Sequence, residues 1–101
     1  TNSTRRIPAL PDVPTVRELG FPNIEANGWN GLFAPAKTPS AAVAKASAAL
    51  QAALKDPAVQ SALLEQGAEP APTTSQELAN YMQQDIAKWR RLIKERNLQL
   101  E

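Results

Sequence analysis

Side chains that could carry out acid–base or nucleophilic chemistry are few in this chain of 101 residues. Histidine and cysteine are both absent, so Ser-His and Cys-His nucleophile pairs, disulfides and thiolate metal sites are excluded. Carboxylates, lysines and one tyrosine remain for proton transfer. The sequence contains no phosphate-binding glycine loop and no calcium-loop spacing. We therefore expect a protein that is not an enzyme and that carries no metal or cofactor.

The most conspicuous carboxylates occupy positions typical of helix capping. Asp56 directly precedes a proline, as an N-cap residue does, and Glu18 and Glu77 each follow a threonine at capping-box spacing. Asp85 falls near the apolar stripe of the last expected helix, where an interaction with Lys88 or with the neighbouring tryptophan is favoured over catalysis.

Trp29 has an unusual setting, flanked by Gly28, Asn30 and Gly31. Glycines within a strand often mark the close approach of a ligand or of another strand. The pattern favours a core tryptophan at a strand crossing, with a ligand contact as the alternative. Lys37, at the start of a helix, could attract an anion, but a solvated loop residue is the favoured interpretation.

The charge balance argues against a nucleic-acid partner. Eleven basic and ten acidic residues give a net charge of +1, and the only basic clusters are the pairs Arg5-Arg6 and Arg90-Arg91. No apolar run approaches the length of a membrane span. The chain begins with neither Met nor a charged-then-apolar leader, which predicts a mature, processed or excised segment of at most one domain.

The first 23 residues contain four prolines and predict an extended connector. Within this connector, the capping-box pair Thr15 and Glu18, followed by Gly20, predicts one helical turn over residues 15–19.

The next segment, residues 24–34, reads IEANGWNGLFA and predicts a strand. Alternation places Trp29 and Phe33 on one side of this strand and Leu32 on the other. Asn27-Gly28 is also a type I′ hairpin signal, but the residues before it are too few and too polar for a partner strand.

Three helices are predicted, over residues 39–55, 57–66 and 75–97. Thr38-Pro39 and Asp56-Pro57 are start signals, and Gly67 is a stop signal. The last helix has a strong apolar stripe formed by Leu78, Tyr81, Met82, Ile86, Trp89 and Ile93, and we assign its tryptophan to the core.

The predicted elements do not make a complete fold, because a strand with a buried face must pair with others to satisfy its backbone groups. We therefore expect an α/β fold of which this chain is a mostly helical piece. Its sheet would be completed by other parts of a larger domain or by a second copy, through edge pairing or domain swapping.

Three segments in this order and spacing resemble the C-terminal part of the tripartite tricarboxylate transporter receptors, the Bordetella uptake gene family. They are LPDVPTVRELGFP (10–22), WNGLFAPAKTP (29–39) and DPAVQSALLEQGAEP (56–70). The run DIAKW (85–89) in the last helix also looks like theirs. The resemblance covers nearly the whole chain.

The resemblance implies a periplasmic binding protein with two α/β domains, of the type II kind, that delivers small organic acids to a pair of membrane permease subunits. Residues 1–3 would end the strand that returns from the second domain, and residues 1–101 would form part of one domain. Four residues match the edges of the ligand cleft: Thr1, Ser3, Trp29 and Asn30. Most carboxylate-binding loops of the family precede this segment, so we do not expect the chain alone to bind a ligand.

A self-contained helical interaction domain is the alternative. In that case the first and last helices would bury each other's stripes, and the region of Trp29 would be a loop. It predicts a compact monomer, whereas the receptor interpretation predicts exposed apolar edges and association of two copies in isolation.

Overall fold

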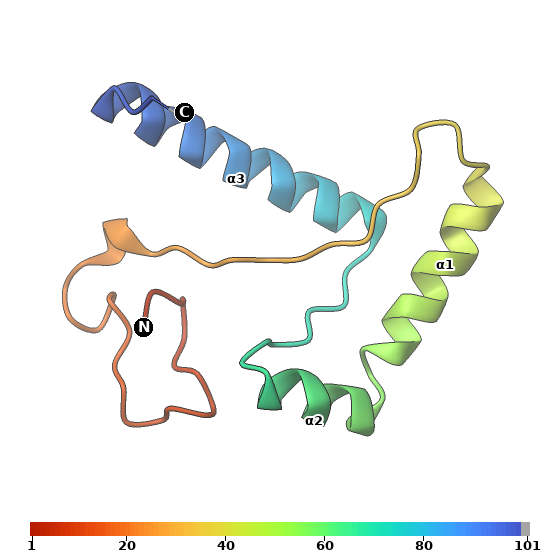
Figure 1. The fold of residues 1–101 in the computed structure, drawn as a ribbon, viewed down its shortest axis with the longest axis horizontal. Coiled ribbons are helices and arrows are strands. Elements are labelled where there is room, and N and C mark those ends of the chain that lie inside the picture. Colours follow the sequence, from red (N-terminus) through yellow and green to blue (C-terminus); the bar gives the residue numbers. More distant parts are fainter. Residues whose placement is uncertain (100–101) are drawn as a thin grey trace.

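The structure, a computed structural model, describes residues 1–99. Along the chain, a 3-10 turn η1 (Pro22–Ile24) is followed by three helices, α1 (Ser40–Ala53), α2 (Pro57–Glu65) and α3 (Ser75–Arg96). Each helix begins and ends within two residues of the range expected from the sequence. In Figure 1 the N-terminal connector and α1 lie at opposite ends of the molecule, and α3 runs along an extended stretch that joins these ends.

Helix α1 begins one residue later than expected. Pro39 is its N-cap residue, and the carbonyl of Pro39 accepts hydrogen bonds from Ala42 and Val43 at 3.0 and 3.2 Å. Thr38, the first residue of the Thr38-Pro39 start signal, therefore lies one position before the N-cap, and no side chain caps this end.

Helix α2 is closed at both ends by the residues that the sequence singles out. The Asp56 carboxylate accepts from the backbone N–H groups two and three residues later, at 2.8 and 3.3 Å. At the other end Gly67 adopts a left-handed φ of +74°. The N–H groups of Gly67 and Ala68 donate to Leu64 and Leu63, which is the Schellman arrangement.

Helix α3 is the longest element, with 22 residues, or roughly 33 Å. A capping box starts it: the Thr74 hydroxyl accepts from the N–H of Glu77 at 3.2 Å, and the Glu77 carboxylate accepts from the N–H of Thr74 at 2.7 Å. Asn97, with φ of 50°, ends α3 in the left-handed conformation, a role that asparagine shares with glycine.

The strand expected over residues 24–34 is wrong for this chain. Ile24 belongs to η1, and residues 25–35 form no β-ladder. Within residues 1–99, the N–H groups of residues 27–34 donate no hydrogen bond to another backbone group. The physical reason is that a ladder needs a second strand, and no described segment provides one. We refer to residues 25–34 as the extended segment.

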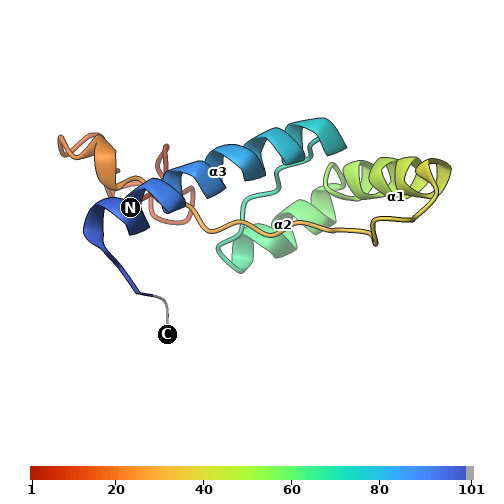
Figure 2. The same cartoon turned by 90° about the horizontal axis from the view of Figure 1, so that it is seen from above.

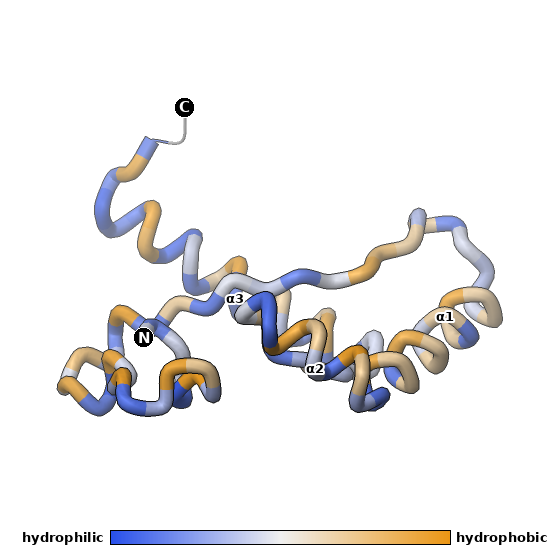
Figure 3. The backbone as a smooth tube through the Cα atoms, turned by 60° about the horizontal axis from the view of Figure 1, so that its bottom comes forward, coloured by the Kyte–Doolittle hydropathy of each residue, from blue (hydrophilic) through white to orange (hydrophobic). Residues whose placement is uncertain are grey.

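The described part of the chain has almost no interior. Only Thr15 and Val16 are buried, with 3% and 9% of their surfaces exposed, whereas Leu32 and Phe33 are 73% and 65% exposed. Figure 3 shows hydrophobic stretches along the whole path of the backbone rather than in one cluster. Trp89, expected in the core, is 38% exposed, because the helices within residues 1–99 do not pack into a shared core around α3.

The open shape also contradicts a self-contained helical domain. The radius of gyration is 16.6 Å, against about 13 Å for a compact domain of this length. Helices α1 and α3 do not bury each other's apolar stripes, and Figure 2 shows the elements spread out along the long axis. No helix in residues 1–99 is both long and apolar enough to cross a bilayer.

Candidate functional site

The N-terminal residues Thr1 and Ser3 lie against the connector. The backbone nitrogen of Thr1 donates to the carbonyl of Pro14 at 2.6 Å, and the carbonyl of Thr1 accepts from Val16 at 2.8 Å. The hydroxyl oxygen of Thr1 is buried and has no hydrogen-bond partner among the described residues. Ser3 is half-buried. These contacts place the beginning of the chain beside the predicted helical turn.

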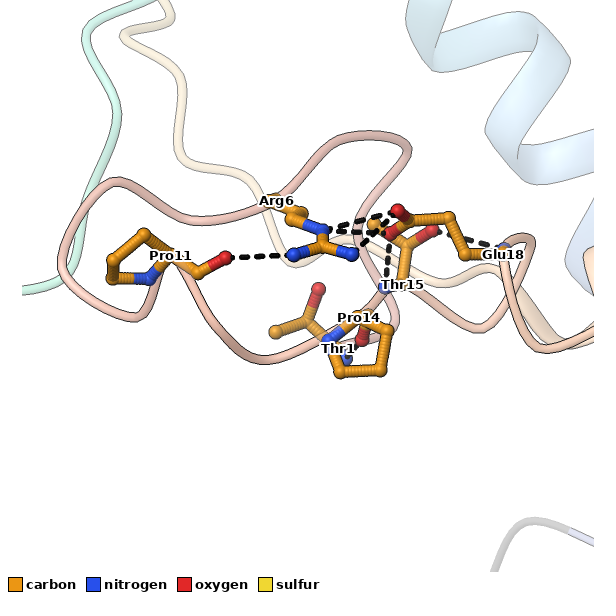
Figure 4. A network of polar contacts seen from close by, with 6 residues as sticks. All are labelled: Thr1, Arg6, Pro11, Pro14, Thr15 and Glu18. Atoms are coloured by element: carbon orange, nitrogen blue, oxygen red, sulfur yellow. Dashed lines mark hydrogen bonds and ion pairs between the residues drawn. The ribbon is translucent and has the colours of Figure 1, made fainter.

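An ion pair and the hydrogen bonds around it close that turn, as Figure 4 shows. The Arg6 guanidinium donates to both carboxylate oxygens of Glu18, at 2.8 to 3.1 Å, and to the carbonyl of Pro11 at 2.9 Å. Glu18 also accepts from the N–H of Thr15 at 2.8 Å and so completes the expected capping box. The hydrogen bonds from Arg6 and then from Thr15 lower the pKa of Glu18 to about 2.

The end of the turn follows the sequence prediction as well. Gly20 adopts φ of +86°, and the N–H groups of Gly20 and Phe21 donate to Arg17 and Val16 at 3.0 and 2.8 Å. This is a second Schellman arrangement, and it directs the chain into η1. We call residues 1–21, held by these bonds, the connector turn.

Two ion pairs, which sequence reasoning missed, attach the connector turn to other parts of the chain. Arg17 pairs with Glu25 at the start of the extended segment, and hydrogen bonding from Arg17 lowers the pKa of Glu25. Arg5 pairs with Glu69 after α2. The Glu25 side chain is only 16% exposed in its pair, whereas the Arg5 side chain in the other pair is 74% exposed, so solvent screens the Arg5 pair more strongly.

The extended segment runs antiparallel to α3 and is held to it by side chains. Lys88 on α3 donates to the carbonyl of Glu25. Further along, the indole N–H of Trp29 donates to Asp85 at 3.0 Å, and the Trp29 ring meets the ring of Tyr81 edge-on, with centroids 5.7 Å apart. Trp29 also contacts Phe33, at a centroid distance of 6.4 Å. Trp29 and Phe33 therefore share a side, as the alternation pattern predicts.

The glycines around Trp29 divide into two kinds. A Cβ on Gly31 would lie 3.1 Å from the Phe33 ring, 3.2 Å from the Trp29 ring and 3.4 Å from Leu78 of α3. A Cβ on Gly28 would meet nothing within 4 Å. Close packing of aromatic side chains against α3 thus accounts for Gly31.

Asn30 lies between these inward residues and is exposed. Successive side chains of an extended backbone point to opposite sides, so Asn30 faces away from α3 while Trp29 faces toward it. The indole N–H of Trp29 is already bonded to Asp85. Of the two residues, Asn30 is the one with polar hydrogen-bonding groups that are free to meet a ligand.

The sequence is similar to those of known proteins over nearly its whole length. The chain matches the family described as "Tripartite tricarboxylate transporter family receptor" over residues 1–98. The chain belongs to this receptor family. It is 36% identical over 97 residues to the "UPF0065 protein in tcbD-tcbE intergenic region" of Pseudomonas sp. (strain P51), a match that covers 95% of this chain and 29% of that protein.

Other relatives give the same result. The chain is 29% identical over 99 residues to "Protein BugT" of Bordetella pertussis, covering 98% of this chain and 30% of BugT. A 54-residue stretch, 54% of the chain, is 52% identical to a UPF0065 protein of Agrobacterium vitis and covers 16% of it. No solved structure matches the chain. The chain thus spans less than a third of the length of these relatives.

For a receptor of this family, the described residues supply two separate polar regions. Thr1 and Ser3 belong to the connector turn, whereas Trp29 and Asn30 belong to the extended segment beside α3. The two regions are linked by one backbone hydrogen bond, from Ala26 to the carbonyl of Asn2 at 3.0 Å.

The hollows of the described surface do not coincide with these regions. One, of about 370 Å³, lies between residues 7–9 and the end of α2, and another, of about 540 Å³, lies between α1 and the start of α3. Neither is lined by any of the four predicted residues. Residues 1–99 also contain no group of acidic side chains arranged to hold a metal ion.

Proposed function

We propose that this chain forms the C-terminal part of a periplasmic solute-binding receptor that captures small organic acids and delivers them to membrane permease subunits. The match to the transporter receptor family over residues 1–98 carries the proposal. The absence of histidine and cysteine from the sequence agrees with a binding role rather than catalysis.

The geometry of the extended segment supports a place in a larger sheet. The N–H groups of residues 27–34 have no backbone partner among the described residues, α3 covers one face of the segment, and Leu32 on the opposite face is 73% exposed. A strand in the sheet of a two-domain receptor needs free backbone groups at its edges and apolar side chains on both faces. The rest of the receptor would supply the neighbouring strands.

In this arrangement the four predicted residues line the edges of the cleft. Asn30 donates through its amide, Ser3 offers a hydroxyl group, Trp29 forms an apolar wall, and Thr1 forms part of the edge while its hydroxyl stays buried. Carboxylates are recognised by N–H and O–H donors in an otherwise apolar cleft. Asn30 is the strongest of the four candidates because it is exposed and lies next to a fixed aromatic ring.

The test joins the chain to the part of BugT that lies outside their match. Citrate, succinate and malate are titrated into this chimera by calorimetry, with intact BugT as the control for folding. Saturable binding to the chimera that Asn30→Ala weakens would support the proposal. A folded chimera that binds none of the three acids would refute it.

A second measurement concerns the chain alone. With its apolar side chains exposed, it should bind none of these acids and should sediment as a dimer or larger species. A monomer at micromolar concentration would refute the expected pairing of two copies.

A further inference from the structure

Asp85 joins two tryptophans that are far apart in the sequence. One carboxylate oxygen accepts from the indole N–H of Trp29 at 3.0 Å, and the other accepts from the indole N–H of Trp89 at 3.1 Å. Trp89 lies one turn further along α3, whereas Trp29 belongs to the extended segment. We call this arrangement the Asp85 bridge.

The bridge needs a carboxylate. An indole nitrogen only donates, and here each carboxylate oxygen of Asp85 accepts from a different indole. An asparagine of the same shape has one acceptor oxygen, and its NH2 group would face the second indole N–H donor to donor. In the position that Asp85 occupies, the side chain of an Asp85→Asn variant therefore keeps the bond to one indole and loses the bond to the other.

Neighbouring contacts fix the rings that the bridge connects. The Trp29 ring is held edge-on by Tyr81, at 5.7 Å between centroids. The ammonium of Lys88 lies 5.3 Å from the centroid of the Trp89 ring, and the same group donates to the carbonyl of Glu25. The carboxylate and the ammonium thus attach the extended segment to α3 at two points.

We propose that Asp85 is a positioning residue of the receptor, which ties Trp29 to α3 and thereby turns Asn30 toward the solute cleft. The second half of this inference rests on the proposed function. Trp29 and Asn30 are adjacent on an extended backbone, so fixing one side chain on the α3 side fixes the other on the opposite side. Asp85 itself does not contact the solute.

The first experiment follows the indole N–H groups of the chain by 15N NMR. Two tryptophans give two indole resonances, which are assigned with Trp29→Phe and Trp89→Phe. In Asp85→Asn, at least one resonance should move to the position of a water-exposed indole. Adding Trp89→Phe to Asp85→Asn removes the competing donor, so the single amide oxygen should restore the bonded resonance of Trp29.

Glu95→Gln on α3 is the matched control, because it makes the same change of charge at an exposed position and should leave both indoles unchanged. Circular dichroism reports whether α3 is intact in each variant. Water-exposed indole resonances in the unmodified chain would overturn the bridge, as would resonances that Asp85→Asn does not move.

The second experiment measures citrate and succinate affinity in the BugT chimera. Loss of one indole hydrogen bond should weaken binding about fivefold in Asp85→Asn, and the double variant should recover it. If the indole resonances shift as expected but the affinity for citrate and succinate does not change, the proposal that Asp85 orients Asn30 is refuted. If the unmodified chimera binds no acid, the proposed function fails, while the indole result still decides whether Asp85 positions Trp29.

Discussion

Adding one methyl group to Gly31 should loosen the extended segment from α3, whereas the same change at Gly28 should not. The new Cβ at Gly31 would lie 3.1 and 3.2 Å from two aromatic rings and 3.4 Å from Leu78, so Trp29 or Phe33 must shift. Overpacking a well-packed core costs about 1 to 3 kcal/mol, and because Phe33 is 65% exposed we expect the lower end of that range here. At Gly28 the methyl group meets nothing within 4 Å, and reduced freedom of the unfolded chain stabilises by about 0.4 to 1 kcal/mol.

The two variants should therefore differ by about 2 kcal/mol in the free energy of docking the segment. The assay is a urea titration in a Trp89→Phe background, where the fluorescence of Trp29 alone reports docking. Circular dichroism at each urea concentration separates undocking from melting of α3. Equal midpoints for Gly31→Ala and Gly28→Ala would refute the packing explanation for Gly31.

Three further outcomes are expected. Because the pKa of Glu18 is lowered to about 2 from its usual value of 4.5, its bond to Arg6 stabilises the connector turn above pH 4.5, and this stabilisation is lost as the pH falls toward 2. Carboxyl 13C shifts check this, and Glu18→Gln should abolish the dependence. Thr74→Ala removes the capping box, which should destabilise α3 by about 1 kcal/mol and reduce its helicity as measured by circular dichroism. Thr73→Ala is the control, and an equal loss of helicity in the two variants would contradict the capping role. Leu32→Lys, at a 73% exposed position, should shift sedimentation of the chain toward monomer; an unchanged dimer would place the contact elsewhere.

The sequence predicted the helices well because their signals are local. Asp56 and the pair Thr74 and Glu77 bond to N–H groups two or three residues away. The N–H groups of Gly67 and Ala68 close α2 by donating to carbonyls three and five residues back. Such contacts depend on the spacing of residue types and hardly on the rest of the fold. The same holds for the turn at Thr15.

The strand failed because pairing depends on partners at a distance. Residues 25–34 are extended, as alternation predicts, but no ladder forms without a neighbouring strand. The interaction of Asp85 was predicted only in part. Its bond to Trp89 spans four residues, whereas its bond to Trp29 spans 56, and no local signal indicates that contact. Apart from the glycines beside Trp29, the four cleft residues had no local signal and depended on the family resemblance.

The extended segment is held almost entirely through side chains, and this determines the order in which a sheet can assemble around it. Few of its backbone groups form hydrogen bonds in the described chain, chiefly the carbonyl of Glu25 and the N–H of Ala26. An incoming strand can therefore hydrogen-bond to residues 27–34 without breaking a bond that already exists. Docking on α3 joins Trp29 to a residue 56 positions away and closes the loop between them. The entropy cost of closing this loop is therefore met before a neighbouring strand is added. Strand addition then proceeds on a segment that is already straight and already oriented.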